Sequence, residues 1–331
     1  MKYLCVSPEK AKEMKELYKD SIERTQQVLK ENGKVLFPLK SNHSLPDVEI
    51  VELDFSPQTG QPTISLPSAY EAYSPSLLVT EEYSEAIYKA LCMKHSCKYV
   101  LLKQRINRLD IRGPQTRLLY STESNPTDEE VIASVKQNSC WYKWYPLHSM
   151  FCRGNIPEKI RMSQLVLRED ELVLDLYAGI GYWTIPLLKR NEGVRVIACD
   201  MNAWSVKALR ENLLKNKVSE RCIVLEGDNA MFQDVYSGKC DRVLLGLLPS
   251  SQRGWPLAIS ALKECGGVLH IHENVPKAEL DQFQEHIKTS LDTLWRELRN
   301  SECRVTIKSI TCVKSYSPKV YHYVFDVQIA H

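Results

Sequence analysis

The feature that most constrains the fold of this chain is a regular alternation of strand-like and helix-like segments after residue 170. Short apolar segments typical of buried strands recur at 171–179, 194–200, 221–228, 241–249 and 266–275. Between them lie amphipathic segments such as 203–217, whose apolar residues share one helical face. This alternation predicts a mostly parallel sheet with helices on both faces. A long helix and two strand-like segments, 303–316 and 320–330, close the chain, and we expect these two strands to be antiparallel.

A glycine-containing turn follows the first of these strands. The sequence DLYAGIG places Asp175 at the strand end and Gly179 and Gly181 in the turn. Glycines at this point let the backbone approach a ligand at the N-terminus of the next helix. A dinucleotide-binding fingerprint needs a third glycine where this chain has Thr184, which weakens a nicotinamide interpretation. Taken alone, such a turn is more often only a tight turn.

Acidic residues end each of the first three strands. Asp200 ends the second strand, and Asp228 and Asn229 follow the third. Because the carboxyl ends of parallel strands meet at one edge of a sheet, we expect these side chains to lie close to Asp175. Asp200 can accept both ribose hydroxyls, and Asp228 and Asn229 lie where an adenine edge would bind. A single strand-end Asp is often only a helix cap, but three in succession predict an S-adenosylmethionine site.

These patterns predict an α/β fold of the class I S-adenosylmethionine-dependent methyltransferase type, which is Rossmann-like, with a smaller N-terminal α+β region. Only three of the 13 glycines precede residue 150, so the tight strand-to-helix turns belong to the C-terminal half. We predict three parts: residues 1–77 as an α+β region with a linker, 78–145 as a small α+β domain, and 146–331 as the domain that binds S-adenosylmethionine.

The first half gives weaker signals. Apolar residues at helical spacing predict a helix within 8–30, and short strands are predicted at 34–39 and 47–55. Residues 55–77 are rich in Pro, Ser, Gln and Thr, which is typical of a linker. A second helix is predicted at 81–95, followed by a strand at 98–106 and a polar loop at 121–134 that leads into a helix or strand.

Seven segments, in this order along the chain, closely resemble one protein family. They are MFCRGNIPEKIRMSQL, DLYAGIGYWTIP, CDMN, GDNA, LGLLPSSQRGWP, GGVLHIHENV and VKSYSPKVYHYVFDV. The family is that of tRNA wybutosine-synthesizing protein 2, aminocarboxypropyltransferases that modify phenylalanine tRNA and are related to the tRNA guanine-N1 methyltransferases. The resemblance runs from residue 140 to residue 327 and is thin over residues 80–120.

The resemblance implies which residues bind S-adenosylmethionine. Lys159 would contact the methionine carboxylate, a charge-assisted contact, although without the resemblance a solvated lysine is favoured. Cys152 stands where we expect serine, and a thiol is a weak donor, so this contact is expected through the backbone. Asp200 stands where relatives commonly have glutamate. Combined with the glycine turn, the predicted cofactor-binding residues are Cys152, Lys159, Asp175, Tyr177, Ala178, Gly179, Gly181, Asp200, Met201, Asp228, Asn229 and Gly246.

The loop after the fourth strand, GLLPSS at 246–251, bears on the reaction. Methyltransferases that act on amino groups commonly have an Asn or Asp here that accepts a hydrogen bond from the attacking nitrogen, and this chain has Leu247 and Leu248. The resemblance implies a carbon nucleophile instead, on the 4-demethylwyosine base 3′ of the anticodon, and transfer of the 3-amino-3-carboxypropyl group with release of methylthioadenosine. His270 and His272 alternate on the fifth strand and could supply a base, but hydrogen-bonded sheet histidines are the simpler interpretation. No catalytic base is assigned.

Basic residues interleaved with aromatic ones suit phosphates and splayed bases of RNA. The net charge is only +2, so a polyanion must meet a local patch. Arginines at 105, 108 and 112 are followed in the sequence by the aromatic residues of the segment WYKWY, 141–145. A solvated basic face beside core aromatics explains the same pattern equally well. The candidate RNA-binding residues are Arg105, Arg108 and Arg112, with Arg161 and Lys314 nearer the site.

The remaining features predict a cytoplasmic enzyme without an obligate protein partner. The chain lacks an apolar stretch of membrane-spanning length and the apolar run of a signal peptide near its first residues. Its 11 cysteines show no pairing pattern, and Cys92, His95 and Cys97 lack a second pair of zinc ligands, so no metal site is predicted. Three rival functions are a tRNA guanine-N1 methyltransferase, a nicotinamide dehydrogenase and a non-catalytic tRNA-binding module.

Overall fold

The computed structural model divides the chain into two units, Met1–Ile64 and Ser65–His331. The structure describes residues 2–18, 22, 29–31, 34–40, 50–52, 66–106 and 113–331. Within the first unit, four strands pair in the order β2 (Leu29–Glu31), β3 (Lys34–Pro38), β1 (Lys2–Val6) and β4 (Ile50–Glu52). Helix α1 (Ala11–Leu17) packs with them around an apolar cluster that includes Leu4 and Phe37.

The predicted helix within 8–30 is wrong at the residues that the structure describes after Tyr18. Helix α1 ends at Leu17, Ile22 forms a β-bridge with Leu39, and Leu29–Glu31 is a strand. Ile22 is buried in the core of this unit. Its apolar side chain therefore packs in the core beside the sheet. The prediction was wrong because spacing alone does not show whether a buried apolar residue belongs to a helix or to a strand.

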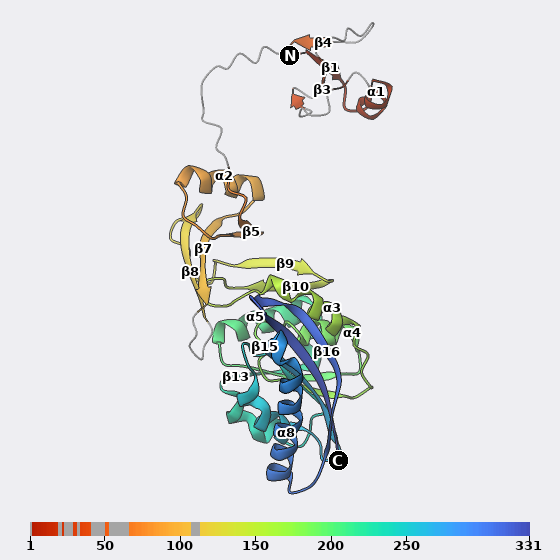
Figure 1. Cartoon of the computed structure of the whole chain (residues 1–331). Coiled ribbons are helices and arrows are strands. Elements are labelled where there is room, and N and C mark those ends of the chain that lie inside the picture. The colour runs from red at the N-terminus through yellow and green to blue at the C-terminus, as the bar shows by residue number, and fades with distance from the viewer. Residues whose placement is uncertain are drawn as a thin grey trace. The chain divides into compact units, whose positions relative to one another are not determined.

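The second unit begins with a small sheet beside one helix (Figure 1). Its strands pair in the order β5 (Tyr70–Tyr73), β6 (Ser76–Val79), β7 (Tyr99–Ile106) and β8 (Pro114–Ser121). Helix α2 (Glu85–His95) connects β6 to the parallel strand β7. The prediction of a linker as far as residue 77 is therefore wrong over its last residues, because Tyr73 and Leu77 are buried parts of this sheet.

A seven-stranded sheet forms the larger part of this unit and confirms the predicted α/β fold. Its strand order is β13-β12-β11-β14-β15-β17-β16. The first five strands are parallel, and β17 lies antiparallel between β15 and β16. The chain order reverses between β11 and β14, which is where such sheets bind ligands. The strands are β11 (Leu172–Asp175), β12 (Arg195–Asp200), β13 (Cys222–Glu226), β14 (Arg242–Leu245), β15 (Gly266–Pro276), β16 (Arg304–Ser317) and β17 (Val320–Ala330).

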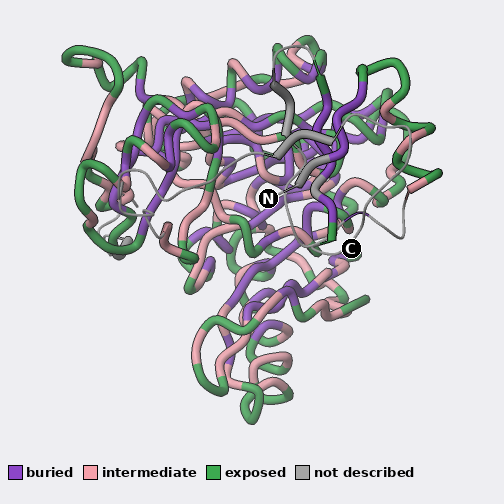
Figure 2. The backbone as a smooth tube through the Cα atoms, turned by 90° about the horizontal axis from the view of Figure 1, so that it is seen from above, coloured by how far each residue is buried: buried purple, intermediate pink, exposed green. Residues whose placement is uncertain are grey.

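Helices cover both faces of this sheet, and the strands between them form the buried layer (Figure 2). One apolar cluster joins the sheet to α4 (Thr184–Arg190) and α5 (Ala203–Lys215), with α3 (Ile156–Gln164) beside α4. The other joins it to α7 (Trp255–Ala261) and α8 (Leu280–Arg299), with the short helix α6 (Gln233–Tyr236) beside α7. None of the described helices is long and apolar enough to cross a membrane.

The hairpin of β9 (Ala133–Gln137) and β10 (Cys140–Trp144) packs on α5. The Asn212 side chain accepts from the backbone N–H of Lys143 at 2.7 Å and donates to its carbonyl at 2.9 Å. Asn216 bonds the backbone of Trp141 in the same way. These bonds occupy the backbone groups of β10 that face away from β9, and they fix the hairpin against α5.

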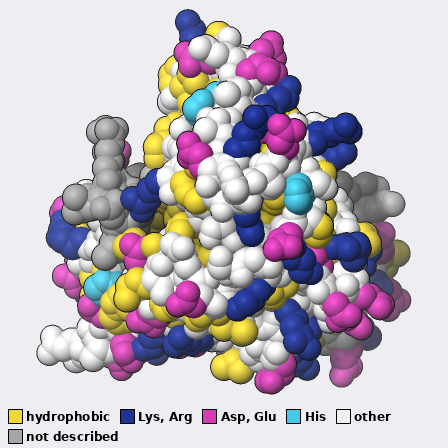
Figure 3. Space-filling model, turned by 90° about the horizontal axis from the view of Figure 1, so that it is seen from below, with side chains coloured by type: hydrophobic (Ala, Val, Ile, Leu, Met, Phe, Trp, Pro, Cys, Tyr) yellow, Lys and Arg dark blue, Asp and Glu magenta, His cyan; other side chains and the backbone are white. Residues whose placement is uncertain are grey.

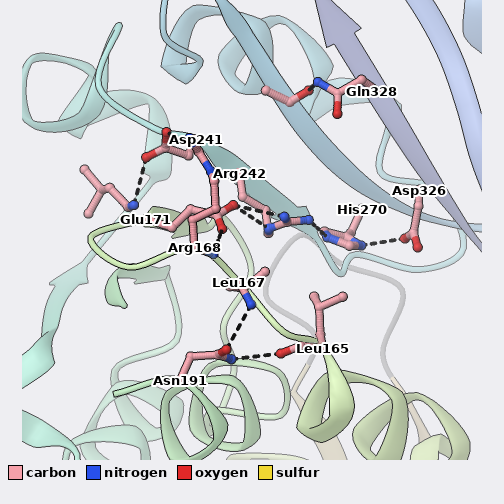
Figure 4. A network of polar contacts seen from close by, with 12 residues as sticks. Leu165, Leu167, Arg168, Glu171, Asn191, Asp241, Arg242, His270, Asp326 and Gln328 are labelled. Atoms are coloured by element: carbon pink, nitrogen blue, oxygen red, sulfur yellow. Dashed lines mark hydrogen bonds and ion pairs between the residues drawn. The ribbon is translucent and has the colours of Figure 1, made fainter. Parts of the chain in front are cut away.

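A buried polar network ties α3 to the sheet. Arg161 donates to Glu158 at 2.7 and 2.8 Å and to Asp326 of β17 at 2.7 Å. Asp326 lies 2.5 Å from His270 Nδ1, and Arg242 donates to His270 Nε2 at 2.7 Å. The network continues from Arg242 to Glu171 (Figure 4).

The charge states in this network follow from its contacts. Burial opposes ionisation of Asp326, but the hydrogen bond from His270 and the charge of Arg161 together lower its pKa. Burial lowers the pKa of His270, so this ring is neutral. Because Arg242 can only donate, His270 accepts at Nε2 and donates its Nδ1 proton to Asp326.

We expect Asp326→Asn to lower the free energy of unfolding by about 2–3 kcal/mol, because it leaves Arg161 without one of its two carboxylates. Denaturant unfolding at pH 7 measures this change. Asp292→Asn is the control, since its pair with Arg296 is largely exposed and its loss should cost under about 0.5 kcal/mol. The lowered pKa of Asp326 stabilises the fold above the pKa of an unfolded Asp, about 3.9, so the difference from wild type should shrink as the pH falls below that value. An equal effect of both variants would contradict the role of Asp326.

Candidate cofactor and substrate site

The turn after β11 has the backbone geometry that its glycines permit. Gly179 and Gly181 have φ of +55° and +96°, a region that residues with a Cβ rarely adopt. A Cβ on Gly181 would lie 2.6 Å from the Ile185 side chain. Thr184, in place of the third glycine of a dinucleotide site, donates its hydroxyl to Asp175 Oδ2 at 2.7 Å. The threonine therefore fixes the strand-end carboxylate.

Asp175 is completely buried at the end of β11. Its Oδ1 has no hydrogen-bond partner among the residues that the structure describes. Burial raises the pKa of this carboxyl to about 7. An unpaired buried oxygen is costly, so a donor from a bound ligand fits this position.

Asp200 connects the glycine turn to the start of α5. Its Oδ2 accepts from the backbone N–H of Gly179 at 2.8 Å, and its Oδ1 accepts from that of Asn202 at 2.9 Å. Each carboxylate oxygen keeps a second lone pair that can receive a ribose hydroxyl. Burial raises the pKa of Asp200. The capping role belongs to Asn202, whose side chain accepts from the N–H groups of Trp204 and Ser205.

The third strand end lies beside the second. Gly227 donates its backbone N–H to the carbonyl of Asp200 at 3.0 Å, which brings the ends of β12 and β13 together. Asp228 is exposed and caps the next turn through Ala230, and Asn229 donates to the Leu176 carbonyl at 3.1 Å. The structure therefore places Asp175, Asp200, Asp228 and Asn229 at one edge of the sheet, with Met201, Tyr177 and Ala178 between them in sequence.

Lys159 of α3 is buried, so the alternative of a solvated lysine is wrong. Its ammonium lies 4.9, 4.2 and 5.1 Å from the ring centres of Tyr142, Phe151 and Tyr182. Its Nζ donates to Gln137 Oε1 at 2.7 Å. Burial lowers the pKa of Lys159 to about 8. We call these four partners, Gln137, Tyr142, Phe151 and Tyr182, the lysine cage.

Cys152 and Lys314 lie next to this cage. The Cys152 backbone N–H donates to the Tyr182 hydroxyl at 3.2 Å, and the Lys314 ammonium lies 3.1 Å from Cys152 Sγ. The Lys314 side chain also packs on Gly154, where a Cβ would lie 3.1 Å from it. Three of the predicted residues, Cys152, Lys159 and Lys314, therefore come together from α3, the segment before it and β16.

The loop 246–251 is anchored to β15. Glu273 Oε1 accepts from the Ser251 backbone N–H at 2.6 Å and from the hydroxyls of Ser250 and Ser251 at 3.2 and 3.0 Å. Burial raises the pKa of Glu273 to about 7. A Cβ on Gly246 would lie 2.6 Å from Trp183 Nε1. The serine hydroxyls therefore bind Glu273, and the loop brings the Gly246 backbone close to Trp183.

Two of the predicted residues are occupied by the polar network. Both nitrogens of His270 have partners, which supports the interpretation of a hydrogen-bonded sheet histidine. Arg161 is held between Glu158 and Asp326, so its RNA contact stays a prediction. His272 differs, because its ring stacks on Trp183 at 5.1 Å and its Nδ1 lies 3.0 Å from His322 Nε2.

The candidate RNA-binding arginines of the small domain fall mostly outside the part of the chain that the structure describes. Arg108 and Arg112 are outside the described residues, as is the side chain of Arg105. In the segment 141–145, Tyr142, Trp144 and Tyr145 are buried, so their aromatic rings belong to the core. Trp141 is 40% exposed, with the ammonium groups of Lys136 and Lys215 at 5.8 and 5.5 Å from its ring.

No group of three or more His, Cys, Asp or Glu side chains that could hold a metal ion occurs in the part of the chain that the structure describes. Cys92 and Cys97 are buried, and His95 bonds the Tyr70 hydroxyl at 2.9 Å. Spacing could not identify the cage residues Gln137, Tyr142, Phe151 and Tyr182 or the loop partner Glu273. Phe151, Tyr182 and Glu273 lie inside recognised motifs, but nothing in their spacing assigns them a role, and Gln137 lies outside every recognised motif.

Comparisons with known proteins agree with this geometry. The TRM5/TYW2 methyltransferase domain family matches residues 133–302. The chain is 43% identical over 194 residues to "tRNA wybutosine-synthesizing protein 2/3/4" of Arabidopsis thaliana, covering 58% of this chain and 19% of that protein. It is 32% identical over 302 residues to "tRNA wybutosine-synthesizing protein 2 homolog" of Danio rerio, covering 80% of this chain and 72% of that protein. A solved structure of P. horikoshii TYW2 in complex with MeSAdo is similar, with a TM-score of 0.64 and 26% identity, over 80% of this chain and 92% of that one. This chain thus spans about a fifth of the plant relative's length.

We expect Asp200→Ala to weaken S-adenosylmethionine binding at least about tenfold. The substitution removes the charged acceptor for ribose, and each such hydrogen bond contributes about 1.5–3 kcal/mol. Titration calorimetry measures the affinity, and circular dichroism checks that the fold is intact. Asp228→Ala is measured for comparison with Asp200→Ala, because the exposed carboxylate of Asp228 accepts from the Ala230 backbone N–H, whereas that of Asp200 accepts from Gly179 in the glycine turn. An Asp200→Ala affinity equal to that of wild type would leave Asp200 with only its backbone bonds.

Proposed function

The chain belongs to the TRM5/TYW2 methyltransferase family, and we propose that it is a tRNA 4-demethylwyosine aminocarboxypropyltransferase. In this role it transfers the 3-amino-3-carboxypropyl group of S-adenosylmethionine to a carbon of the 4-demethylwyosine base in phenylalanine tRNA, a step of wybutosine biosynthesis. The observation that carries the proposal is the buried ammonium of Lys159, which lies over the Phe151 ring. Its segment is followed in the sequence by the one that begins at the strand-end residue Asp175.

The site fits S-adenosylmethionine on its own geometry. Asp175 Oδ1 and Asn155 Oδ1 are buried without partners among the described residues, and the glycine turn leaves room where side chains would clash. Asp200 would receive the ribose hydroxyls, and Asp228 and Asn229 would lie beside the adenine. S-adenosylmethionine supplies a sulfonium that activates three carbons, and positioning decides which carbon is transferred.

Lys159 is suited to orient the amino-acid tail rather than the adenosine. Its ammonium is desolvated by the lysine cage, where an ion pair with a carboxylate is much stronger than in water. The bond to Gln137 holds the ammonium in place before a ligand arrives. Fixing the tail in this way would direct the methylene carbon of the tail, and not the methyl group, toward the substrate base.

The rival functions have less support. A tRNA guanine-N1 methyltransferase would share the fold, but GLLPSS offers no amide or acid acceptor, and the loop's own hydroxyls bind Glu273. A nicotinamide dehydrogenase would need glycine in place of Thr184, which here donates to Asp175. A non-catalytic tRNA-binding module would not need the strand-end carboxylates that the chain retains.

We also propose that the substrate tRNA meets a local surface rather than a uniformly basic face. Lys and Arg side chains are interspersed with Asp and Glu on the face drawn in Figure 3. Lys103 pairs with Glu71 at 2.8 Å and Arg117 pairs with Glu82, which reduces the charge that β7 and β8 offer to phosphates. Phenylalanine tRNA as the specific partner, the cytoplasmic location, the absence of an obligate protein partner and the division at residue 145 between the small domain and the catalytic domain stay parts of this proposal.

The decisive test uses S-adenosylmethionine labelled separately in its carboxyl and methyl carbons, with tRNA that carries 4-demethylwyosine. We expect carboxyl label in the tRNA and methylthioadenosine as the by-product, because the tail is the group that Lys159 orients. Methyl label in unmodified tRNA of the same sequence, with release of S-adenosylhomocysteine, would instead establish the N1-methyltransferase alternative, because N1 of the guanine is already bonded within the third ring of 4-demethylwyosine. Unmodified tRNA of the same sequence serves as the control substrate.

Cofactor binding should depend on the protonation of Lys159. The pKa of about 8 in the free protein means that the ammonium loses its proton as the pH rises through 8, whereas a bound carboxylate would raise that pKa. We therefore expect affinity to fall above about pH 8, and binding near pH 8 to take up roughly half a proton. Calorimetry in buffers of different ionisation enthalpy measures this uptake. Lys159→Met should abolish the uptake and Asp200→Ala should keep it, so uptake that persists in Lys159→Met would contradict the role of Lys159.

A further inference from the structure

Two polar side chains in the wall of the site lack partners. Neither Nδ2 nor Oδ1 of Asn274 has a hydrogen-bond partner among the described residues, and the same holds for His322 Nδ1. All three atoms are buried, and the His322 ring has no exposed surface. Buried polar atoms nearly always have a partner, because leaving one unpaired costs its full desolvation penalty. Three such atoms on adjacent strands therefore call for a polar ligand.

Asn274 and His322 face the same space. They are direct partners in the antiparallel ladder of β15 and β17, so both side chains project from one face of the sheet. His270, His272 and Asn274 occupy every second position along β15, so all three side chains point to that face. Their contacts with Arg161 and Glu158 identify it as the face that α3 covers.

Contacts on both sides connect this pair to the site. The Asn274 backbone N–H donates to the Pro249 carbonyl at 2.8 Å, so Asn274 lies beside the loop 246–251. On the other side, Lys314 is the ladder partner of His322, and its ammonium lies 3.1 Å from Cys152 Sγ. The pair therefore lies between the loop after β14 and the segment that carries Cys152 and Lys159.

The hydrogen-bonding character of the pair is that of a neutral site. His322 Nε2 lies 3.0 Å from His272 Nδ1, so one of these two nitrogens donates to the other. Burial lowers the pKa of both rings, that of His322 to about 4 with a further contribution from the charge of Lys314. Glu158 lies 3.9 Å from His272 Nε2 and favours a proton there. In that tautomer His322 Nε2 donates to His272, and His322 Nδ1 keeps a lone pair for a donor in the site.

We propose that Asn274 and His322 form a subsite that hydrogen-bonds the edge of the substrate base, with the Asn274 amide giving one donor and one acceptor and His322 Nδ1 giving an acceptor. The inference rests on the proposed function, because it names the part of the same site that recognises the modified purine. A planar heteroaromatic base carries neutral donors and acceptors along its edge, which match these three atoms. The amino group of the cofactor tail fits less well, because the Lys314 ammonium beside His322 would repel it.

The test compares the same substitution at two asparagines, Asn274 and the buried Asn191. Asn274→Leu removes a side-chain amide that has no hydrogen-bond partner among the described residues. Replacing an unpaired polar group by an apolar one of similar size is nearly neutral, so the Tm should not fall. Asn191→Leu removes side-chain bonds to Leu167, Leu165 and Leu187 far from the site, so its Tm should fall. For transfer to tRNA carrying 4-demethylwyosine, we expect kcat/KM to fall at least about tenfold in Asn274→Leu and to stay near wild type in Asn191→Leu at a temperature where both are folded.

Two binding measurements complete the test. Wild type should bind tRNA carrying 4-demethylwyosine more tightly than the same tRNA carrying guanosine, and Asn274→Leu should lose this preference while it keeps its affinity for S-adenosylmethionine. His322→Gln, which replaces the Nε2 position and deletes Nδ1, should reduce the preference in the same direction.

Three other outcomes would refute either the subsite or the proposed function. A loss of S-adenosylmethionine affinity in Asn274→Leu would assign the pair to the cofactor tail and refute the subsite. Wild-type kcat/KM and wild-type preference in Asn274→Leu would refute it as well. Failure of wild type itself to transfer the carboxyl label would refute the proposed function, and is distinguishable because it does not depend on either variant.

Discussion

The position of α3 against the sheet depends on the pairing of Arg161 with Glu158 and Asp326. Removing either partner would leave a charge inside the protein, where it is strongly destabilising. Arg161 lies two residues after Lys159 on the same short helix, so the ion pair that anchors the helix also sets where the Lys159 ammonium points. The same carboxylate of Asp326 orients His270, and through Arg242 the network reaches Glu171 at the start of β11. One buried network thus connects the lysine cage to the strand that leads to the glycine turn.

The two halves of the site differ in how they gain their order. On the adenosine side, backbone N–H groups hold the carboxylate of Asp200, and Thr184 holds that of Asp175, so the site is organised by the strand ends themselves. On the opposite side, three aromatic rings and Gln137 surround Lys159, and the polar atoms of Asn274 and His322 remain without partners among the described residues. A site whose carboxylates are fixed in place on one side, and whose neutral polar atoms await a partner on the other, is suited to hold one ligand firmly while it recognises a second.

Sequence patterns predicted the large sheet well because its evidence is local. Each strand of the alternation is a continuous apolar run, and each helix has its own amphipathic period, so errors in one element do not affect the next. The same approach was wrong for Ile22 and Leu29, which were predicted as parts of a helix within 8–30, and for the last residues of the linker before residue 77. In both places, apolar residues such as Ile22 and Leu77 are buried by strands that pair across a distance, and spacing alone does not show which partner buries them.

The sequence by itself determined the parallel sheet, the glycine turn and the acidic strand ends, because the carboxyl ends of parallel strands meet at one edge whatever the loops between them do. Only the tertiary structure decided the lysine cage, the pairing of Arg161 with Asp326 and the contact of Lys314 with Cys152. The last two join residues that are 165 and 162 positions apart, and no local pattern carries that information. It also decided that Asn274 and His322 face one space, because the register of β15 and β17 brings them together. Local periodicity specifies which face of an element is buried, and packing between elements specifies which side chains meet there.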